Sequence, residues 1–81
     1  MKLRWHPAAI YDLRSLPTWR LAAEVDAAVL RFAATGEGQL RRTSADDPHN
    51  VRLITARTVV LLHVDEVDEV IHVGRVFRSG R

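Results

Sequence analysis

The sequence contains no cysteine, which excludes disulfide bonds, thiolate metal sites and cysteine nucleophiles. This composition is compatible with a reducing compartment, and we expect a cytoplasmic protein. No stretch approaches the roughly 20 consecutive apolar residues that a membrane-spanning helix needs, so we expect no membrane partner. The first residues are not followed by an apolar run and a small-residue cleavage site, so we also expect no signal peptide.

Lysine is almost absent, because Lys2 is the single lysine among twelve basic residues and the other eleven are arginines. Guanidinium groups suit bidentate contacts with phosphate or carboxylate groups. The net charge is only +2, and a basic bias this weak cannot by itself demonstrate nucleic-acid binding. A GC-rich genome, which favours arginine and alanine codons, would explain the same excess of arginine.

Glycine-rich phosphate loops and metal-ligand spacings are also missing. Gly36 and Gly38 follow a predicted helix instead of opening one, so they indicate a helix stop. The four histidines lack the spacing of a zinc site. The acidic residues at 65–69 are interpreted as a solvated hairpin, not as a cation site. We therefore expect no metal and no cofactor.

The composition, 47% hydrophobic and 27% charged over 81 residues, predicts one folded domain that spans residues 1–81. Two residue periods define its elements, the alternation of a strand and the 3.6-residue repeat of a helix. In chain order they predict a strand at 2–6, helices at 8–16 and 18–34, a polar connection at 36–50, and strands at 51–56, 58–64 and 70–77.

This order predicts an α+β fold of the type β-α-α-β-β-β, with two helices packed on one face of a small, mainly antiparallel sheet. The helix at 18–34 carries a wide apolar arc, so we expect it to contact more than one neighbour. Trp19 in this arc and Trp5 in the first strand are both expected in the core. The other sheet face is then exposed, or covered by a partner.

Two segments carry a family resemblance. LRWHPAAIYDLRSLP (3–17) and NVRLITARTVVLLHVDEVDEVIHVGRVFR (50–78) are similar to the first strand and helix and to the later strands of RelE/ParE superfamily toxins. The resemblance covers most of the chain, with its weak part at 36–50. It implies the toxin component of a type II toxin–antitoxin system, with a cognate antitoxin as partner. RelE-like members cleave mRNA on the ribosome and ParE-like members inhibit DNA gyrase, and the fold does not choose between them.

The resemblance also implies site residues on the later strands. Arg52 matches a basic family position, which makes it a candidate catalytic or phosphate-contacting residue; a solvated strand arginine is the alternative. Arg57 is either a displaced equivalent of a family arginine that binds RNA or a partner, or an exposed turn residue. Arg75 and Arg78 are catalytic candidates, because the family carries functional arginines there. Arg81 is an RNA- or partner-binding candidate, and a frayed basic terminus is the alternative for all three.

A histidine is the candidate general base, because imidazole gains and loses a proton near neutral pH. His72 is flanked by two apolar residues and should point to the exposed sheet face. His49 and His63 are less well placed, and His6 is interpreted as a cap at a strand-to-helix junction. The family often ends with an aromatic residue, commonly tyrosine, that stacks or assists proton transfer. No tyrosine follows Phe77 in this sequence.

Three hypotheses remain open at the level of the sequence. The first is a metal-independent endoribonuclease that cleaves ribosome-bound mRNA. The second is an inhibitor of DNA gyrase without catalytic residues, which the missing terminal aromatic residue and the displaced arginine favour. The third is an inactive homologue that serves as an interaction or repressor subunit.

Overall fold

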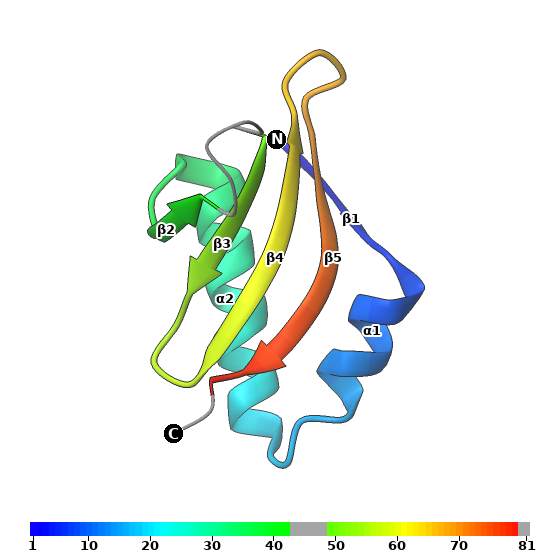
Figure 1. The fold of residues 1–81 in the computed structure, drawn as a ribbon, viewed down its shortest axis with the longest axis vertical. Helices are drawn as coiled ribbons and strands as arrows, with labels where there is room; N and C mark the ends of the chain where they lie inside the picture. The colour runs from blue at the N-terminus through cyan, green and yellow to red at the C-terminus, as the bar shows by residue number, and fades with distance from the viewer. Residues whose placement is uncertain (43–48, 80–81) are drawn as a thin grey trace.

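Two helices and five strands follow one another in the computed structural model, which describes residues 1–42 and 49–79. In chain order they are β1 (Lys2–Trp5), α1 (Pro7–Arg14), α2 (Trp19–Thr35), β2 (Gln39–Arg42), β3 (Asn50–Ile54), β4 (Thr58–Asp65) and β5 (Val70–Arg78). The strands form one sheet in the order β1-β5-β4-β3-β2 (Figure 1). Strand β1 runs parallel to β5, and the other pairs are antiparallel. The predicted α+β fold with a mainly antiparallel sheet is therefore confirmed.

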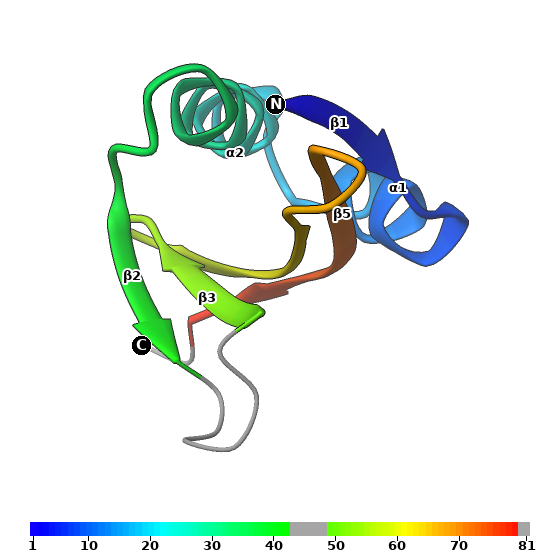
Figure 2. The same ribbon diagram turned by 90° about the horizontal axis from the view of Figure 1, so that it is seen from above.

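Helix α2 lies across one face of the sheet and builds the core with it (Figure 2). The hydroxyl oxygen of Thr18 accepts a hydrogen bond from the backbone N–H of Leu21 at 3.2 Å and so caps the helix. The helix ends at Gly36, which adopts a φ of 74°. Val25 and Val29 of α2 are fully buried. Among the described residues, neither helix is long and apolar enough to cross a membrane.

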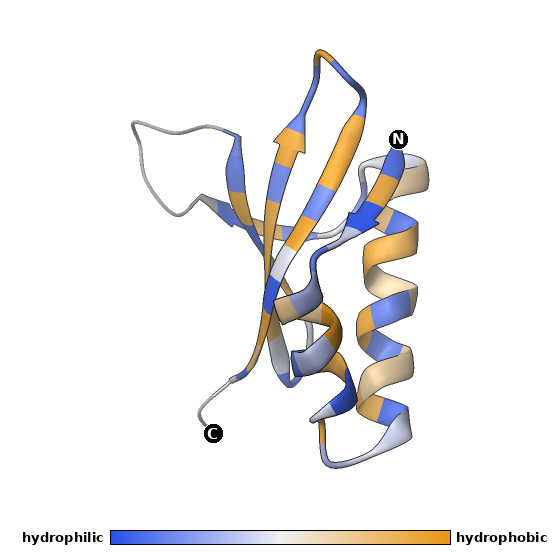
Figure 3. Cartoon of the chain, turned by 90° about the vertical axis from the view of Figure 1, so that its right-hand side faces the viewer, coloured by the Kyte–Doolittle hydropathy of each residue, from blue (hydrophilic) through white to orange (hydrophobic). Residues whose placement is uncertain are grey.

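Strands β3 and β4 bury a side chain at every second position, and β5 does so up to Val73. Orange and blue segments alternate along part of the sheet in Figure 3, while β4 carries a continuous hydrophobic run from Val59 to Leu62, as expected for a central strand. Each large apolar side chain that is removed from water in this way stabilises the fold by roughly 1.5–3 kcal/mol. The buried strand residues of the core are Val51, Leu53, Val60, Leu62, Ile71, Val73 and Val76.

The prediction that Trp19 is part of the core is wrong. Its side chain is 75% exposed, and Leu30 on the same helical stripe is 51% exposed. Helix α2 therefore packs on the sheet through one stripe and not through a wide arc. The guanidinium group of Arg20 lies 5.6 Å from the centre of the Trp19 ring, a cation–π contact that covers part of the indole. Trp5, as predicted, is half-buried and packs against the core.

Helix α1 lies beside β5, along the part of that strand that β1 does not reach (Figure 1). Pro7 occupies the first turn of α1. Backbone N–H groups in the first turn have no hydrogen-bond partner within the helix, so a proline, which lacks this group, costs nothing there. Ala9 is completely buried, so α1 contributes to the same core as α2. The backbone N–H of Val76 donates to a carboxylate oxygen of Asp12 at 3.0 Å. A side chain of α1 thus takes the place of a neighbouring strand at this sheet edge.

The prediction of a strandless connection at 36–50 is wrong, because Gln39–Arg42 forms the edge strand β2. This strand pairs with β3, and Leu40 lies opposite Leu53. It has only four residues, three of them polar, so it shows no clear alternation. Gly38 allows the close approach, since a Cβ atom there would lie 2.7 Å from Cδ1 of Leu53. The observed order is therefore β-α-α-β-β-β-β.

The acidic residues between β4 and β5 form a hairpin turn, as predicted. A carboxylate oxygen of Asp65 accepts hydrogen bonds from the backbone N–H groups of Val67 and Asp68, both at 3.1 Å. These hydrogen bonds lower the pKa of Asp65, and the bond from the backbone of Asp68 has the largest effect. Val67 at the tip is 92% exposed, so the turn is solvated.

Candidate functional site

The sheet face turned away from α2, here called the open face, presents three rows of side chains that run across the strands. In the part of the chain that the structure describes, α2 lies on the opposite face and α1 lies at the β5 edge (Figure 2). Paired residues on neighbouring strands point to the same face. The rows are Asn50, His63, His72 and Arg4; then Arg41, Arg52, Leu61 and Arg75; then Gln39, Ile54, Val59 and Phe77.

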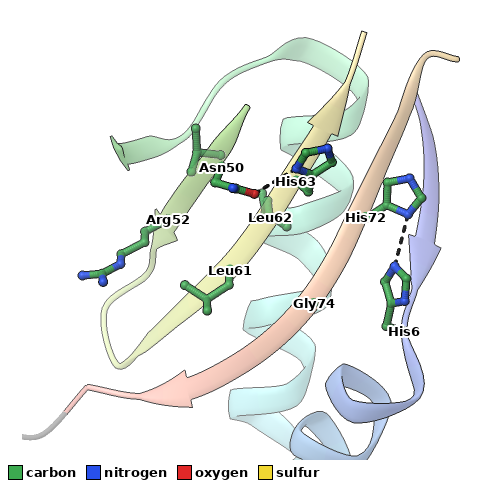
Figure 4. Close-up of a pocket in the computed structure, with 9 residues that line it drawn as sticks. His6, Asn50, Arg52, Leu61, Leu62, His63, His72 and Gly74 are labelled. Atoms are coloured by element: carbon green, nitrogen blue, oxygen red, sulfur yellow. Dashed lines mark hydrogen bonds between the residues drawn. The ribbon is translucent and has the colours of Figure 1, made fainter. Parts of the chain in front are cut away.

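Asn50, His63 and His72 of the first row and Arg52 and Leu61 of the second border a hollow of about 640 Å³ on the open face (Figure 4). Leu61 supplies apolar lining, and Arg52 supplies a positive charge. His6, His63 and His72 add three imidazole rings, which come from the central strand β4, from β5 and from the junction after β1. Guanidinium and imidazole groups around an apolar floor can hold a phosphate group and exchange protons with its neighbours.

Two histidines from distant parts of the chain meet beside this hollow. The Nε2 atom of His6 and the Nδ1 atom of His72 are 3.1 Å apart, and their ring centres are 5.3 Å apart (Figure 4). Ile71 and Val73 are buried, so His72 points to the open face, as predicted. His6 precedes α1, but its side chain makes no capping hydrogen bond. His6 therefore occupies the N-cap position of α1, as predicted, but it caps the helix through its backbone carbonyl and leaves its ring free to meet His72.

His63 extends the imidazole row towards β3. Its ring centre lies 6.1 Å from that of His72 and 6.2 Å from that of His49. Its Nδ1 atom lies 2.9 Å from the side-chain oxygen of Asn50. Because an amide oxygen only accepts, this contact places a hydrogen on Nδ1 of His63. Spacing along the sequence missed this alignment of imidazoles, because it depends on the register between strands.

Arg52 projects from β3 at the border of the hollow (Figure 4). Its neighbours Val51 and Leu53 are buried, so alternation places Arg52 on the open face, as predicted. Arg41 on β2 is its cross-strand partner. Like charges directly opposite each other destabilise a sheet. An anion bound between these two guanidinium groups would relieve that repulsion.

Arg75 reaches the open face with its charge already paired. Its Nε and Nη2 atoms donate to the two carboxylate oxygens of Asp12 at 2.7 and 3.2 Å. These bonds, followed by the bond from the Val76 backbone, hold the pKa of Asp12 below its ordinary value. The same contact raises the pKa of Arg75. The Arg75 side chain is nevertheless 50% exposed, so an anion on the open face can still approach it.

Arg57 and Arg78 lie away from the open face. Arg78 pairs with Thr58, whose side chain is fully buried on the α2 side of the sheet. Arg57, in the exposed turn between β3 and β4, borders a separate hollow together with Arg78 near the start of α2. The Ser79 backbone N–H donates to the Arg57 carbonyl at 2.8 Å and holds the two segments together. Arg81 lies outside the described residues.

Comparisons with known proteins find a likeness in fold. No protein-family model and no curated protein sequence matches the chain. The isolated RelE toxin of E. coli matches with a TM-score of 0.80 at 12% identity, over 99% of this chain and 85% of that one. A chain of the toxin–antitoxin complex RelBE2 from Mycobacterium tuberculosis matches with a TM-score of 0.69 at 19% identity, over 96% of both chains.

A chain of the YoeB–YefM complex from Staphylococcus aureus matches with a TM-score of 0.72 at 10% identity, over 95% of this chain and 94% of that one. The same fold thus recurs in an isolated toxin and in two complexes. The sequence similarity is low in each case, so the likeness is one of architecture. This chain has the fold of the RelE-type toxins, as its sequence resemblance predicted.

Proposed function

We propose that this protein is a growth-inhibiting toxin of the RelE/ParE superfamily, the toxin component of a type II toxin–antitoxin system. Its likeness in fold to the RelE toxin and to chains of the RelBE2 and YoeB–YefM complexes supports this proposal. The observation that carries it is the open face, where Arg52 and three histidines border one hollow. A cognate antitoxin that covers this face would neutralise the toxin.

The proposed activity is cleavage of mRNA on the ribosome by transesterification. The ribose 2′-hydroxyl loses its proton to a base, and its oxygen attacks the adjacent phosphorus. The bond from phosphorus to the 5′ oxygen breaks, and this oxygen takes a proton from solvent. The products are a 2′,3′-cyclic phosphate and a 5′-hydroxyl. The step needs a proton acceptor and stabilisation of negative charge at phosphorus, and the chemistry requires no metal ion.

Three groups on the open face would serve this reaction. His72 is the proposed base, because its ring borders the hollow. Arg52 is the proposed stabiliser of the charge at phosphorus, since its guanidinium group lies at the same hollow. Arg75 already donates to the carboxylate of Asp12 in α1. It could stabilise the charge at phosphorus only if it donated to the phosphate and to Asp12 at the same time. Arg57 and Arg78 lie on the α2 side, where contact with the antitoxin or with the ribosome is their proposed role.

A gyrase inhibitor that binds its target without catalysis is the second candidate. The pairing of Arg75 with Asp12 and the position of Arg78 on the α2 side favour it, because both reduce the free cationic charge on the open face. An inactive homologue that serves as an interaction or repressor subunit is a weaker alternative with the same fold.

Induced expression in a bacterial host separates these functions. The nuclease proposal expects growth arrest within minutes, rapid loss of mRNA, and cuts inside translated codons. We expect Arg52→Ala to reduce this cleavage by at least about tenfold, on the scale of a lost charge-stabilising group. Arg20→Ala, which removes an exposed arginine from α2, is the matched control and should cleave as the wild type does.

Two other outcomes would contradict the nuclease proposal. Induction of the SOS response with gyrase-linked DNA breaks would establish the inhibitor instead. Harmless expression of a folded, soluble chain would favour the inactive homologue. Equal cleavage by the wild type and Arg52→Ala would show that the open face is not where the phosphate binds.

A further inference from the structure

Backbone contacts hold His6 and His72 together, although 66 positions separate them in the sequence. The backbone N–H of His6 donates to the carbonyl of Val73 at 3.0 Å, and its own carbonyl accepts from the N–H of Ile10 at 3.0 Å. Pro7 restricts the backbone directly after His6. His72 lies in the middle of β5, paired on both sides with β1 and β4. The two rings are therefore placed by regular secondary structure and not by a loose loop.

The direction of their hydrogen bond decides what His72 can do. One of the two facing nitrogen atoms must carry a hydrogen and the other must offer a lone pair. When Nδ1 of His72 donates, its Nε2 keeps a lone pair and can accept a proton. When Nδ1 accepts from His6 instead, the hydrogen of a neutral His72 sits on Nε2, and the ring cannot act there as a base.

We propose that His6 is a positioning residue that holds His72 with Nδ1 as the hydrogen-bond donor and Nε2 as the proton acceptor on the open face. This inference rests on the ribonuclease function proposed above. After His72 takes the proton of the 2′-hydroxyl, its Nδ1–H makes a charge-assisted hydrogen bond to the neutral ring of His6. His6 thus acts on His72 as the aspartate of a Ser-His-Asp triad acts on its histidine, without touching the substrate.

The charged groups around His72 are compatible with a protonated intermediate. Arg4 on β1 and His63 on β4 are its cross-strand neighbours. Asp65 lies further along β4, and its pKa is lowered mainly by the backbone N–H of Asp68 and to a smaller degree by the charge of His72. The Asp65 carboxylate thus brings a negative charge near His72, opposite in sign to that of Arg4.

Two substitutions of His6 separate positioning from packing. His6→Phe keeps an aromatic ring but removes the acceptor, whereas His6→Gln keeps an oxygen that can accept from Nδ1 of His72. His49→Phe is the matched control, because it makes the same chemical change at a ring outside the hollow. Single-turnover cleavage of mRNA on programmed ribosomes by the full chain, at limiting and saturating ribosome concentrations, separates the rate of the reaction from binding.

We expect His6→Phe to lower the saturating rate constant by roughly 10- to 100-fold, a part of the roughly 10²- to 10⁴-fold that a general base contributes. The ribosome concentration at half-saturation should stay unchanged, because His6 does not touch the substrate. His6→Gln should recover most of the lost rate, and His49→Phe should match the wild type. This recovery also keeps the test valid if His6→Phe folds poorly.

Nitrogen-15 NMR of the His72 ring in the full chain gives a reading that does not depend on cleavage. We expect the hydrogen of neutral His72 on Nδ1 in the wild type, and both tautomers in His6→Phe. A hydrogen on Nε2 in the wild type, or wild-type cleavage by His6→Phe, overturns the role of His6 and leaves the ribonuclease function standing. A wild-type chain that cleaves no mRNA overturns the proposed function, and the role of His6 with it.

Discussion

Replacement of Leu53 by alanine tests the division of the sheet into a buried face and an open face. Leu53 is 1% exposed and belongs to the core between α2 and the sheet. A Leu→Ala change at such a site costs roughly 2–5 kcal/mol, because it removes buried methyl groups and leaves a cavity. A domain of 81 residues has a free energy of unfolding of only about 4–12 kcal/mol, so this loss is a large share of the total.

Leu61→Ala is the matched control on the neighbouring strand. Leu61 lies on the open face beside Arg52 and is only partly buried. The same chemical change should therefore cost about 1 kcal/mol or less there, since less apolar surface returns to water. For a domain of this size each kcal/mol lowers the unfolding temperature by roughly 4–8 °C. We expect a drop of about 8–40 °C for Leu53→Ala and of less than about 8 °C for Leu61→Ala.

Urea unfolding followed by tryptophan fluorescence measures both variants, because Trp5 packs against the core and changes its environment when the chain unfolds. The midpoint should fall while the slope with urea concentration stays constant, as expected when only stability changes. Equal losses for the two variants, or a larger loss for Leu61→Ala, would refute the reasoning. Either result would mean that the open face is packed as tightly as the core.

Two further predictions concern contacts that hold the edges of the fold. The pKa of Asp12 is lowered from 3.8 in the folded state, so its stabilisation is fully present above that value and is lost as the pH falls through the folded pKa. Asp12→Asn should therefore be less stable than the wild type at pH 7, and this difference should shrink as the pH falls below 3.8, as urea midpoints at several pH values would reveal. A valine at Gly38 would press on Leu53, where even a Cβ atom would lie 2.7 Å from Cδ1. We expect Gly38→Val to cost about 1–3 kcal/mol and to speed amide hydrogen exchange in β2, while unchanged exchange would contradict the close approach.

The parts of the fold that follow a regular period were predictable. Alternation placed Val51 and Leu53 inside and Arg52 outside, because one face of β3 must be apolar to pack on α2. The 3.6-residue period predicted α2, and Gly36 marked its end correctly. In these elements local sequence and tertiary packing favour the same structure, so no knowledge of the neighbours was needed.

Contacts between distant segments were not predictable in the same way. His6 meets His72 across 66 positions, and Asp12 meets Arg75 across 63. Neither pair follows from a period, because each depends on where β1 stops and α1 begins beside β5. Trp19 shows the same limit from the other side. Its helical stripe is apolar, yet Trp19 is 75% exposed at the start of α2 and the guanidinium group of Arg20 lies over its ring. The helical period alone could not show that this stripe faces away from the sheet.

A β-bulge in β5 decides which arginines reach the open face. Leu62 pairs with Val73 and the preceding Leu61 pairs with Arg75, so Gly74 is the extra residue on β5. Before the bulge, the even-numbered positions of this strand point to the open face. After it, the odd-numbered positions do, because one inserted residue shifts the alternation by one.

Uninterrupted alternation would place Arg78 on the open face with His72 and would direct Arg75 into the core. The bulge reverses both directions, so Arg75 emerges beside the hollow, Val76 becomes 4% exposed, and Arg78 turns to the α2 side. The sequence hides this shift, because a Cβ atom at Gly74 would meet only a backbone oxygen at an ordinary 3.7 Å. Two arginines three positions apart therefore cannot act on one phosphate. The positive charge on the open face therefore comes from different strands, and the register of the sheet brings those strands together.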